Sequence, residues 1–189
     1  MMRLLPTWRE YIAWDAYNPA SEPVADVWPK YQALIVRTDG DVRIADTMSW
    51  GVPHTIPGKR PGTMITKRVT NVRNLSSTFW KSMIAKPAQR CLVPFTTFAE
   101  PKVGLGRAEH WFRVPSEPVA AFAGIWRPST EGNVFAFLTC EPNPLVAPLH
   151  PKAMPVILQA EDYDRWLTTD YEGACDLAQP YPSQLMSLE

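Results

Sequence analysis

Glu100 has the setting that most favours acid–base chemistry. It ends a largely apolar run, Cys91-Leu-Val-Pro-Phe-Thr-Thr-Phe-Ala-Glu100. Apolar and aromatic neighbours disfavour the ionised form of a carboxyl group, so we expect the pKa of Glu100 to be raised. A carboxyl group with a raised pKa can transfer protons near neutral pH. The alternative is an ordinary surface glutamate at the end of a strand.

His150 is the second candidate for proton transfer. It lies in Pro148-Leu-His150-Pro-Lys-Ala-Met-Pro155, between two expected elements. Loops on a rigid scaffold carry a large share of catalytic groups. An imidazole and a carboxyl group with separated pKa values can serve as a proton-transfer pair. The alternative is a solvent-facing histidine.

The segment Thr70-Asn71-Val72-Arg73-Asn74-Leu75 combines groups that suit nucleic acid. The amide of Asn71 can hydrogen-bond a sugar or a base edge. The guanidinium of Arg73 can hold a phosphate with its fork of donors. The alternative is a turn in which the asparagines act as caps.

A basic block surrounds that segment. Residues 55–130 contain 12 lysines and arginines, Lys67 and Arg68 among them, but only three acids. Because the formal net charge of the chain is zero, the remaining residues have the opposite excess. Unless folding mixes the two, the block predicts a positive face that attracts a polyanion. Four aromatic residues in or beside the block could stack on bases, although burial in the core is the commoner role: Trp50, Phe95, Phe98 and Trp111.

Several kinds of site are not expected. The chain has no Walker loop, G-x-G-x-x-G, G-x-S-x-G or H-E-x-x-H motif, so we predict no cofactor. Its three histidines are scattered and its three cysteines lack C-x-x-C spacing, which argues against a metal site and a disulfide framework. No apolar run approaches the roughly 20 residues that span a bilayer, and we see no signal peptide. We therefore expect a cytoplasmic protein.

The elements that must position these residues are short. Strands do not alternate with helices, so a doubly wound parallel sheet is not expected. We predict one α+β domain over residues 1–189, with a mostly antiparallel, barrel-like sheet and a loosely packed tail over 168–189. The expected strands are 32–37, 42–50 (after an Asp39-Gly40 turn), 90–94, 110–114, 119–126, 134–139 and 154–159; the expected helices are 7–17, 77–85 and 161–167, and 51–63 is an expected loop.

Several short motifs follow one another in a specific order. They are Ser49-Trp50-Gly51-Val52-Pro53, Thr70-Asn71-Val72-Arg73-Asn74, Arg90-Cys91-Leu92-Val93-Pro94 before Phe98-Ala99-Glu100, Phe122-Ala123-Gly124-Ile125-Trp126, Phe137-Leu138-Thr139, and His150 to Leu158 ahead of Trp166-Leu167. Each motif alone is weak. Together, over residues 49–167, they resemble the SOS-response-associated peptidase (SRAP) family, whereas residues 1–48 match it only loosely.

The resemblance implies a single α+β domain that shields abasic sites in single-stranded DNA during the SOS response, in the cytoplasm at the nucleoid. In this family the α-amine and the thiol of an N-terminal cysteine attack the aldehyde of the abasic sugar and form a stable thiazolidine. Glu100 matches the glutamate that assists proton transfer, and His150 matches the histidine that acts as acid and base.

The resemblance also implies DNA contacts. Asn71 matches the asparagine that holds the abasic sugar, and Arg73 matches the arginine on the phosphate backbone. Trp50 is expected near the DNA face, and Thr139 in the lining of the site. The expected partner is single-stranded DNA with abasic sites, and a monomer is sufficient for shielding it.

The chain departs from the family at its start. Met1 and Met2 stand where the initiator methionine and the catalytic cysteine are expected, and no thiazolidine can close on a methionine. A second difference is Leu75, where the family often has an acid. Three explanations of the missing cysteine stay open: a misassigned or lost N-terminal piece, a degenerate member that only binds DNA, or an N-terminal amine that forms a reversible Schiff base, which strand cleavage can follow.

Three functions therefore compete. The first is an abasic-site crosslinker or lyase that depends on Glu100 and His150. The second is a single-stranded DNA-binding module with an inactive site. The third is a cysteine peptidase in which Cys91 or Cys140 pairs with His150, although Cys91 lies in an apolar run of the kind in which inert thiols are common.

Overall fold

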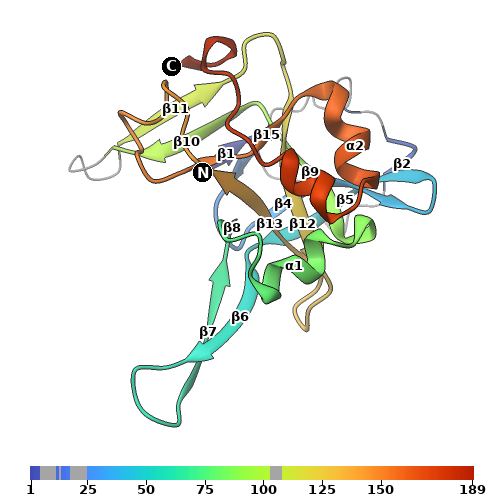
Figure 1. Cartoon of the computed structure of the whole chain (residues 1–189), viewed down its shortest axis with the longest axis vertical. Helices are drawn as coiled ribbons and strands as arrows, with labels where there is room; N and C mark the ends of the chain where they lie inside the picture. The colour runs from blue at the N-terminus through green and yellow to red at the C-terminus, as the bar shows by residue number, and fades with distance from the viewer. Residues whose placement is uncertain (5–11, 13, 18–24, 103–107) are drawn as a thin grey trace.

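The computed structural model describes residues 1–4, 12, 14–17, 25–102 and 108–189. These residues form two larger sheets, a long two-stranded hairpin and a few short helices (Figure 1). The α+β class is confirmed, and most pairings between the described strands are antiparallel. No helix in the described part of the chain has the length and apolar character needed to cross a membrane.

The centre of the largest sheet is a set of five strands. They are β4 (Gln32–Asp39), β5 (Val42–Trp50), β9 (Arg90–Phe95), β12 (Ala120–Arg127) and β13 (Val134–Cys140). Strand β13 pairs in parallel with the end of β5, so the order β13-β12-β9-β4-β5 closes on itself. The predicted turn at Asp39-Gly40 is confirmed, and Gly40 has a φ of +62° that suits glycine there. The short strands β2 (Ala16–Tyr17), β8 (Asn71–Val72), β14 (Met154–Pro155) and β15 (Ile157–Leu158) extend the sheet.

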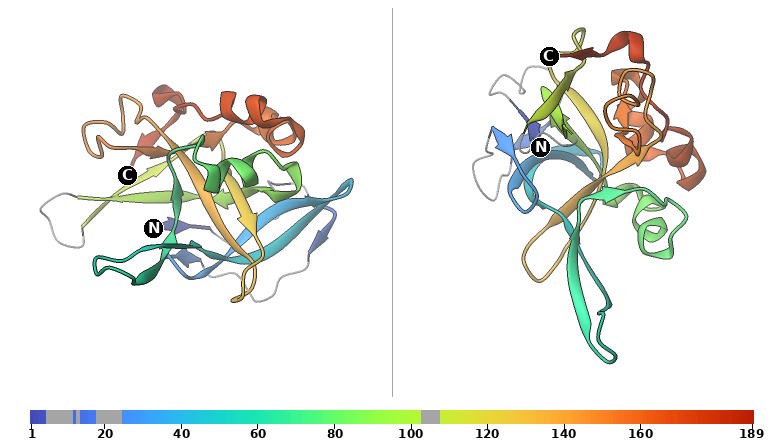
Figure 2. Two further views of the ribbon diagram at one scale, coloured as in Figure 1. Left: turned by 60° about the horizontal axis from the view of Figure 1, so that its bottom comes forward. Right: turned by 90° about the vertical axis from the view of Figure 1, so that its left-hand side faces the viewer.

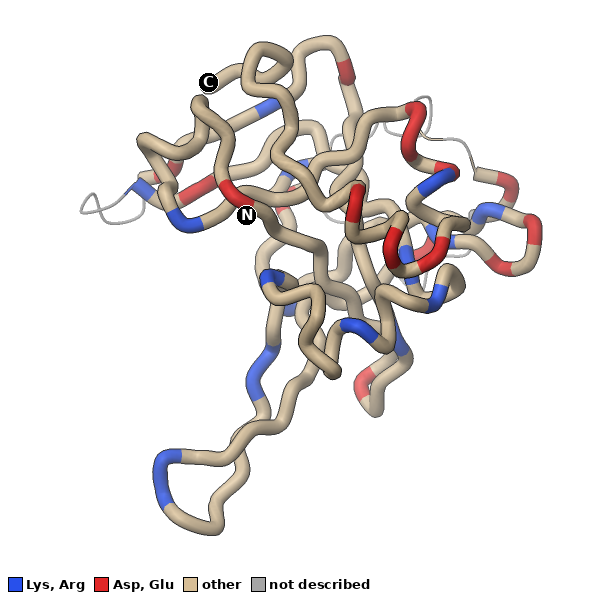
Figure 3. The backbone as a smooth tube through the Cα atoms, viewed as in Figure 1, with Lys and Arg blue, Asp and Glu red and all other residues tan. Residues whose placement is uncertain are grey.

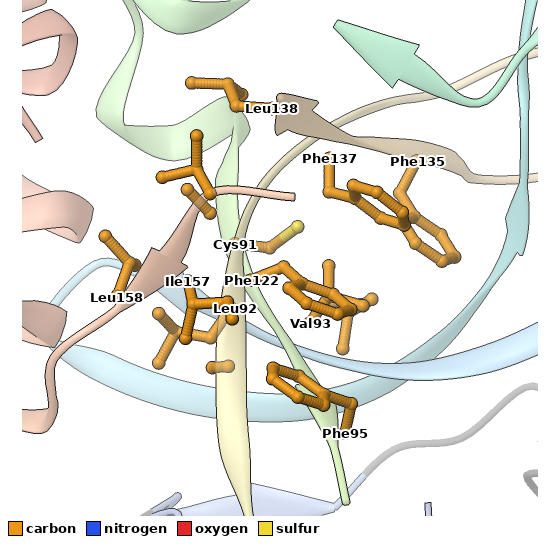
Figure 4. Packing of buried hydrophobic residues seen from close by; sticks show 14 of the residues in the cluster. Cys91, Leu92, Val93, Phe95, Phe122, Phe135, Phe137, Leu138, Ile157 and Leu158 are labelled. Atoms are coloured by element: carbon orange, nitrogen blue, oxygen red, sulfur yellow. The ribbon is translucent and has the colours of Figure 1, made fainter. Parts of the chain in front are cut away.

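Apolar runs explain why the central strands are buried. Every residue of β9 and β13 is buried. The rings of Phe95 and Phe122 stack with their centroids 3.9 Å apart, and those of Phe122 and Phe137 lie 4.8 Å apart (Figure 4). Burial of a large apolar side chain contributes about 1.5–3 kcal/mol, so these rings fix the strands that carry them. At Gly124 a Cβ would lie 2.7 Å from the Cys91 Sγ atom, so this close approach of β12 to β9 requires glycine.

A second sheet places the start of the chain beside residues from the middle of the sequence. Its order is β16 (Ser187–Leu188), β11 (Glu109–Arg113), β10 (Thr97–Pro101), β1 (Met2–Arg3) and β3 (Asp26–Val27). Met2 pairs with Phe98 of β10 on one side and with Val27 on the other. The pairing places Met1 beside Ala99 and Glu100, although 98 positions separate Met1 from Ala99.

The hairpin of β6 (Val52–Pro57) and β7 (Met64–Val69) projects away from both sheets (Figures 1 and 2). We call residues 52–69 the arm. The expected loop over 51–63 was therefore wrong, because its first half is a strand. Pro53 and Pro57 are compatible with that strand because, among the described strands, β6 pairs only with β7, and the strand edge away from β7 needs no backbone donors.

Helices pack at one side of the large sheet. They are α1 (Thr78–Ile84), α2 (Tyr163–Thr168) and α3 (Tyr171–Asp176), with 3-10 turns at Pro87–Gln89, Ala160–Asp162 and Ser183–Leu185. The predicted helices at 77–85 and 161–167 are confirmed within a few residues. The buried Arg90 donates hydrogen bonds to the carbonyl groups of Thr169 and Asp170, which ties β9 to the α2–α3 connection.

Two expectations at the chain ends need comment. The helix expected over 7–17 falls mostly outside the described residues, and its last part, Ala16–Tyr17, is a strand. The tail over 168–189 is not loosely packed. Tyr181 and Met186 are buried, and β16 pairs with β11, because the tail covers apolar surface that the helices leave open.

Candidate active site

A cavity of about 210 Å³ is lined by residues from both sheets. Apolar walls come from Phe98, Phe122, Phe137 and Met154, and polar groups reach in from several elements. Five of the residues predicted from sequence line it: Trp50, Asn71, Glu100, Thr139 and His150. The fold therefore brings together side chains that lie up to 100 positions apart.

Glu100 and His150 are direct partners. The Nδ1 atom of His150 lies 2.6 Å from an Oε atom of Glu100. The Glu100 side chain is only 17% exposed and that of His150 is 29% exposed. Burial raises the pKa of Glu100, whereas the charge of His150, the charge of the N-terminal amine and the hydrogen bond from His150 act against the increase. The raised pKa expected from the apolar run is confirmed, and the pair is suited to hold and move a proton.

Asn143 builds the turn that presents His150. Its Oδ1 atom accepts hydrogen bonds from the backbone N–H groups of Leu145 and Val146 at 3.1 and 3.0 Å. Its Nδ2 atom donates to the carbonyl group of Tyr181 at 2.7 Å, and the side chain is buried. The backbone N–H of His150 then donates to the carbonyl group of Val146. Sequence reasoning missed Asn143, because its role depends on a contact with the distant tail.

The N-terminal amine is a further group at this site. Met1 lines the cavity, and its amine lies 3.5 Å from the carbonyl oxygen of Ala99. Burial lowers the pKa of this amine, and the negative charges of Glu109 and Glu100 act in the opposite direction. A lowered pKa increases the share of the neutral amine, which is the nucleophilic form. The sequence left an N-terminal amine open as a reacting group, and the pairing of β1 with β10 places the Met1 amine at the cavity.

Asn71, Thr139 and Trp50 form the opposite part of the lining. Asn71 is exposed on β8, and Thr139 is buried with its hydroxyl 3.4 Å from the carbonyl oxygen of Val72. Trp50 is only 5% exposed, and its Nε1 atom donates to the carbonyl group of Thr70 at 3.1 Å. Trp50 is thus a wall of the cavity with one contact face, not a projecting platform.

Arg73, the predicted phosphate ligand, lies outside the cavity lining, as do Lys67 and Arg68 of the basic block, which were expected at a DNA-binding face. Arg73 donates to a Glu141 carboxylate oxygen at 2.6 Å and to the carbonyl group of Lys152. Arg68 donates to the carbonyl group of Gly51 at 2.9 Å and is paired with Glu131. Lys67 is exposed on the arm. Arg68 therefore anchors the arm. Arg73 must leave its ion pair with Glu141 before it can bind a phosphate.

Exposed aromatic residues stand beside the cavity at a turn that sequence reasoning did not single out. Pro29 lines the cavity, and its neighbours Trp28 and Tyr31 are 44% and 52% exposed. Lys30 between them has a φ of +76°, a strained value for a residue with a Cβ atom. The sequence feature that could have indicated this turn is Trp28-Pro-Lys-Tyr31 in a proline-rich stretch.

The cysteines do not join His150. Cys91 is fully buried, and burial raises its pKa. Burial also raises the pKa of Cys140 to about 11, and its Sγ atom faces the carbonyl group of Met154. Neither lines the cavity beside His150, and the raised pKa of each thiol disfavours the thiolate form that a peptidase nucleophile needs. Among the described residues no group of three or more His, Cys, Asp or Glu could hold a metal ion.

Comparison with known proteins gives the family of the chain. The family model described as SOS response associated peptidase (SRAP) matches residues 6–189. The chain belongs to the SRAP family. The match extends beyond the 49–167 region in which the motifs lie and includes the tail. No curated protein matched the chain.

Solved structures with the SRAP-like fold are also similar. A protein from Bordetella bronchiseptica has 27% identity and a TM-score of 0.76, with 99% of this chain and 96% of that chain covered. A protein from Bacteroides thetaiotaomicron has 22% identity and a TM-score of 0.67, with 84% and 73% covered. A phage-related protein from Bordetella bronchiseptica has 20% identity and a TM-score of 0.65, with 90% and 82% covered. The last two likenesses concern the fold alone.

Proposed function

We propose that this SRAP protein binds single-stranded DNA and captures the aldehyde of an abasic site as an imine on the α-amine of Met1. The observation that supports it best is the convergence of that amine with the Glu100–His150 pair in one cavity. Family membership supports the DNA-damage role. Met1 and Met2 have no thiol, so an imine on the Met1 amine cannot close to a thiazolidine.

The chemistry can be followed atom by atom. The neutral amine attacks the aldehyde carbon, and the carbonyl oxygen takes a proton to give a carbinolamine. In reaching the carbinolamine the nitrogen gives up one proton. Protonation of the hydroxyl group then allows the carbon–oxygen bond to break, which releases one water molecule and leaves an iminium, and loss of the second nitrogen proton gives the neutral imine. Glu100 has the raised pKa that suits the proton donor, and His150 is placed to return a proton to it.

The size and lining of the cavity favour a sugar without a base. A volume of about 210 Å³ lies below the range of roughly 300–1,000 Å³ that is typical of sites for drug-sized ligands. Asn71 and Thr139 offer an amide and a hydroxyl for the sugar oxygens, and phenylalanine side chains provide an apolar wall. A deoxyribose fits this description better than a complete nucleotide.

Strand cleavage is a further outcome of the same intermediate. The imine acidifies the sugar C2′ proton, and loss of that proton with the 3′ phosphate breaks the strand by elimination. His150 or Glu100 would accept the proton. The second candidate function is a DNA-binding module without capture, and the absence of a thiol at Met1 and Met2 favours it.

A denaturing gel separates these possibilities. The protein is incubated with a labelled single strand that has one abasic site, with and without borohydride, beside an intact strand. We expect a slow band with borohydride and the abasic strand only, because the reductant converts the imine into a stable amine. A cleaved strand without borohydride indicates the elimination step. DNA binding without a slow band or cleavage would contradict the proposal and support the binding module.

A further inference from the structure

The arm is the largest feature of the fold that the cavity chemistry leaves unexplained. Within the described part of the chain its two strands pair only with each other, in a ladder from Val52↔Val69 to Pro57↔Met64. Figure 2 shows it extending well beyond the body of the protein. A projecting hairpin buries little apolar surface of its own, so its presence calls for a role outside the core.

The arm grows directly out of the cavity. β6 begins two residues after Trp50, and β7 returns to Thr70 and Asn71. Trp50, Thr70 and Asn71 all line the cavity. The base of the arm therefore borders the cavity.

The charge of the arm is entirely positive. No aspartate or glutamate occurs between Gly51 and Ala99. Lys59, Arg60 and Lys67 are exposed, and none of them forms an ion pair with the described part of the chain. Figure 3 shows basic residues along one strand and at the tip of the arm. Basic side chains without a carboxylate partner are available to bind phosphates.

The arm is also held in a fixed shape. At the tip the N–H of Gly58 donates to the carbonyl group of Thr63 at 2.8 Å, and Gly62 takes a φ of +76°. At the base Arg127 donates to the carbonyl group of Pro53 at 2.6 Å, and the ring of His54 lies 4.1 Å from that of Phe79. A preformed arm loses little conformational entropy on binding, which favours its use as a binding surface.

We infer that the arm binds the phosphates of the single-stranded DNA that flanks the abasic site. The ligands are Lys59, Arg60 and Lys67, whereas Arg68 fixes the base of the arm. Met64 and Ile65, which are 62% and 41% exposed, add apolar contacts for unstacked bases. This inference rests on the proposed function, which gives the position of the DNA strand. It implies that the protein contacts a longer stretch of DNA than the cavity alone could contact.

The test compares a long strand with a minimal one. The variant Lys59→Ala, Arg60→Ala, Lys67→Ala should bind a long single strand several-fold more weakly. The slope of log affinity against log salt should fall in magnitude by about two, since three single-strand phosphate contacts contribute about 0.7 each. Borohydride capture of an abasic site with one nucleotide on each side should be unchanged.

A matched variant controls for net charge. Lys86→Ala, Arg113→Ala, Arg165→Ala removes three exposed charges outside the arm and should leave the slope nearly as in the wild type. Both variants should unfold at the wild-type temperature, because the substituted side chains are exposed.

Three results would overturn the inference. The first is a wild-type affinity and slope in the arm variant, and the second is an equal loss in both variants. The third is weakening that appears only with duplex DNA. Failure of the proposed function is distinguishable, because capture would then be absent on both strands while binding to an intact long strand still reports on the arm.

Discussion

Substitution of Glu100 by glutamine has two opposing effects on imine formation, and their magnitudes can be compared. The substitution removes a proton donor 2.6 Å from His150. Loss of a general acid typically slows a reaction by roughly 10²–10⁴-fold. The substitution also removes a negative charge that raises the pKa of the Met1 amine, so the neutral share of the amine increases.

The second effect is bounded. The ordinary pKa of an α-amine is about 8, so at pH 7 roughly a tenth of the amine is neutral even without any shift. Burial lowers the pKa further, so the neutral share can rise by at most about tenfold. The loss of the acid outweighs this gain. We expect Glu100→Gln to form the imine at least about tenfold more slowly than the wild type.

Glu109→Gln is the matched control. Glu109 also raises the pKa of the amine, but it does not line the cavity or contact His150. Its substitution should leave the rate unchanged or increase it by up to about tenfold. Single-turnover trapping with borohydride on abasic single-stranded DNA measures both variants. A Glu100→Gln rate equal to that of Glu109→Gln would refute the role of Glu100 as the proton donor.

The pH dependence follows from the same two groups. The wild-type rate should rise as the amine loses its proton, with a midpoint below pH 8 because burial lowers the pKa of the amine. The rate should also fall as the carboxyl group of Glu100 ionises, with a midpoint above the ordinary value because burial raises that pKa. Glu100→Gln should lose this fall, and a profile that keeps it would assign the fall to another group.

Three further outcomes are expected. Glu141→Gln should strengthen single-stranded DNA binding a few-fold, because the exposed ion pair that Arg73 must leave stabilises by roughly 0–1 kcal/mol; a filter-binding titration checks it, and weaker binding would contradict it. Asn143→Ala should lower the free energy of unfolding by roughly 3 kcal/mol, measured in urea, because it removes hydrogen bonds to three buried or half-buried backbone groups; a loss near zero is the contrary result. Cys91→Ser with Cys140→Ser should retain imine capture on the gel, and a loss of capture in a folded double variant would reopen the thiol mechanism.

Local sequence patterns were sufficient to predict the elements that a clear turn or apolar spacing marks. The Asp39-Gly40 turn between apolar runs predicted the β4–β5 hairpin, and the spacing of Phe79, Trp80 and Met83 predicted α1. The strand β6 was missed because Pro53 and Pro57 normally mark loops, and only the isolated position of the hairpin makes them tolerable. The packing of the tail was missed because it depends on Tyr181 and Met186 meeting surfaces formed by distant residues.

The sequence predicted the proton-transfer residues of the site. It did not predict the contacts that the fold brings to the site from distant residues. The apolar run before Glu100 and the loop around His150 predicted that both could be functional, and the fold places them 2.6 Å apart. The position of the Met1 amine depends on the pairing of β1 with β10, which no local pattern indicates. The pairing of Arg68 with Glu131 and of Arg73 with Glu141 likewise joins residues that are more than 60 positions apart.

The most direct test identifies the nitrogen that reacts. The protein, with Met1 as its first residue, is trapped with borohydride on an abasic single strand, digested and analysed by mass spectrometry. We predict a reduced adduct on the α-amine of Met1 and no trapping after chemical acetylation of that amine. An adduct on a lysine side chain, or no adduct on a strand that the protein binds, would contradict the account.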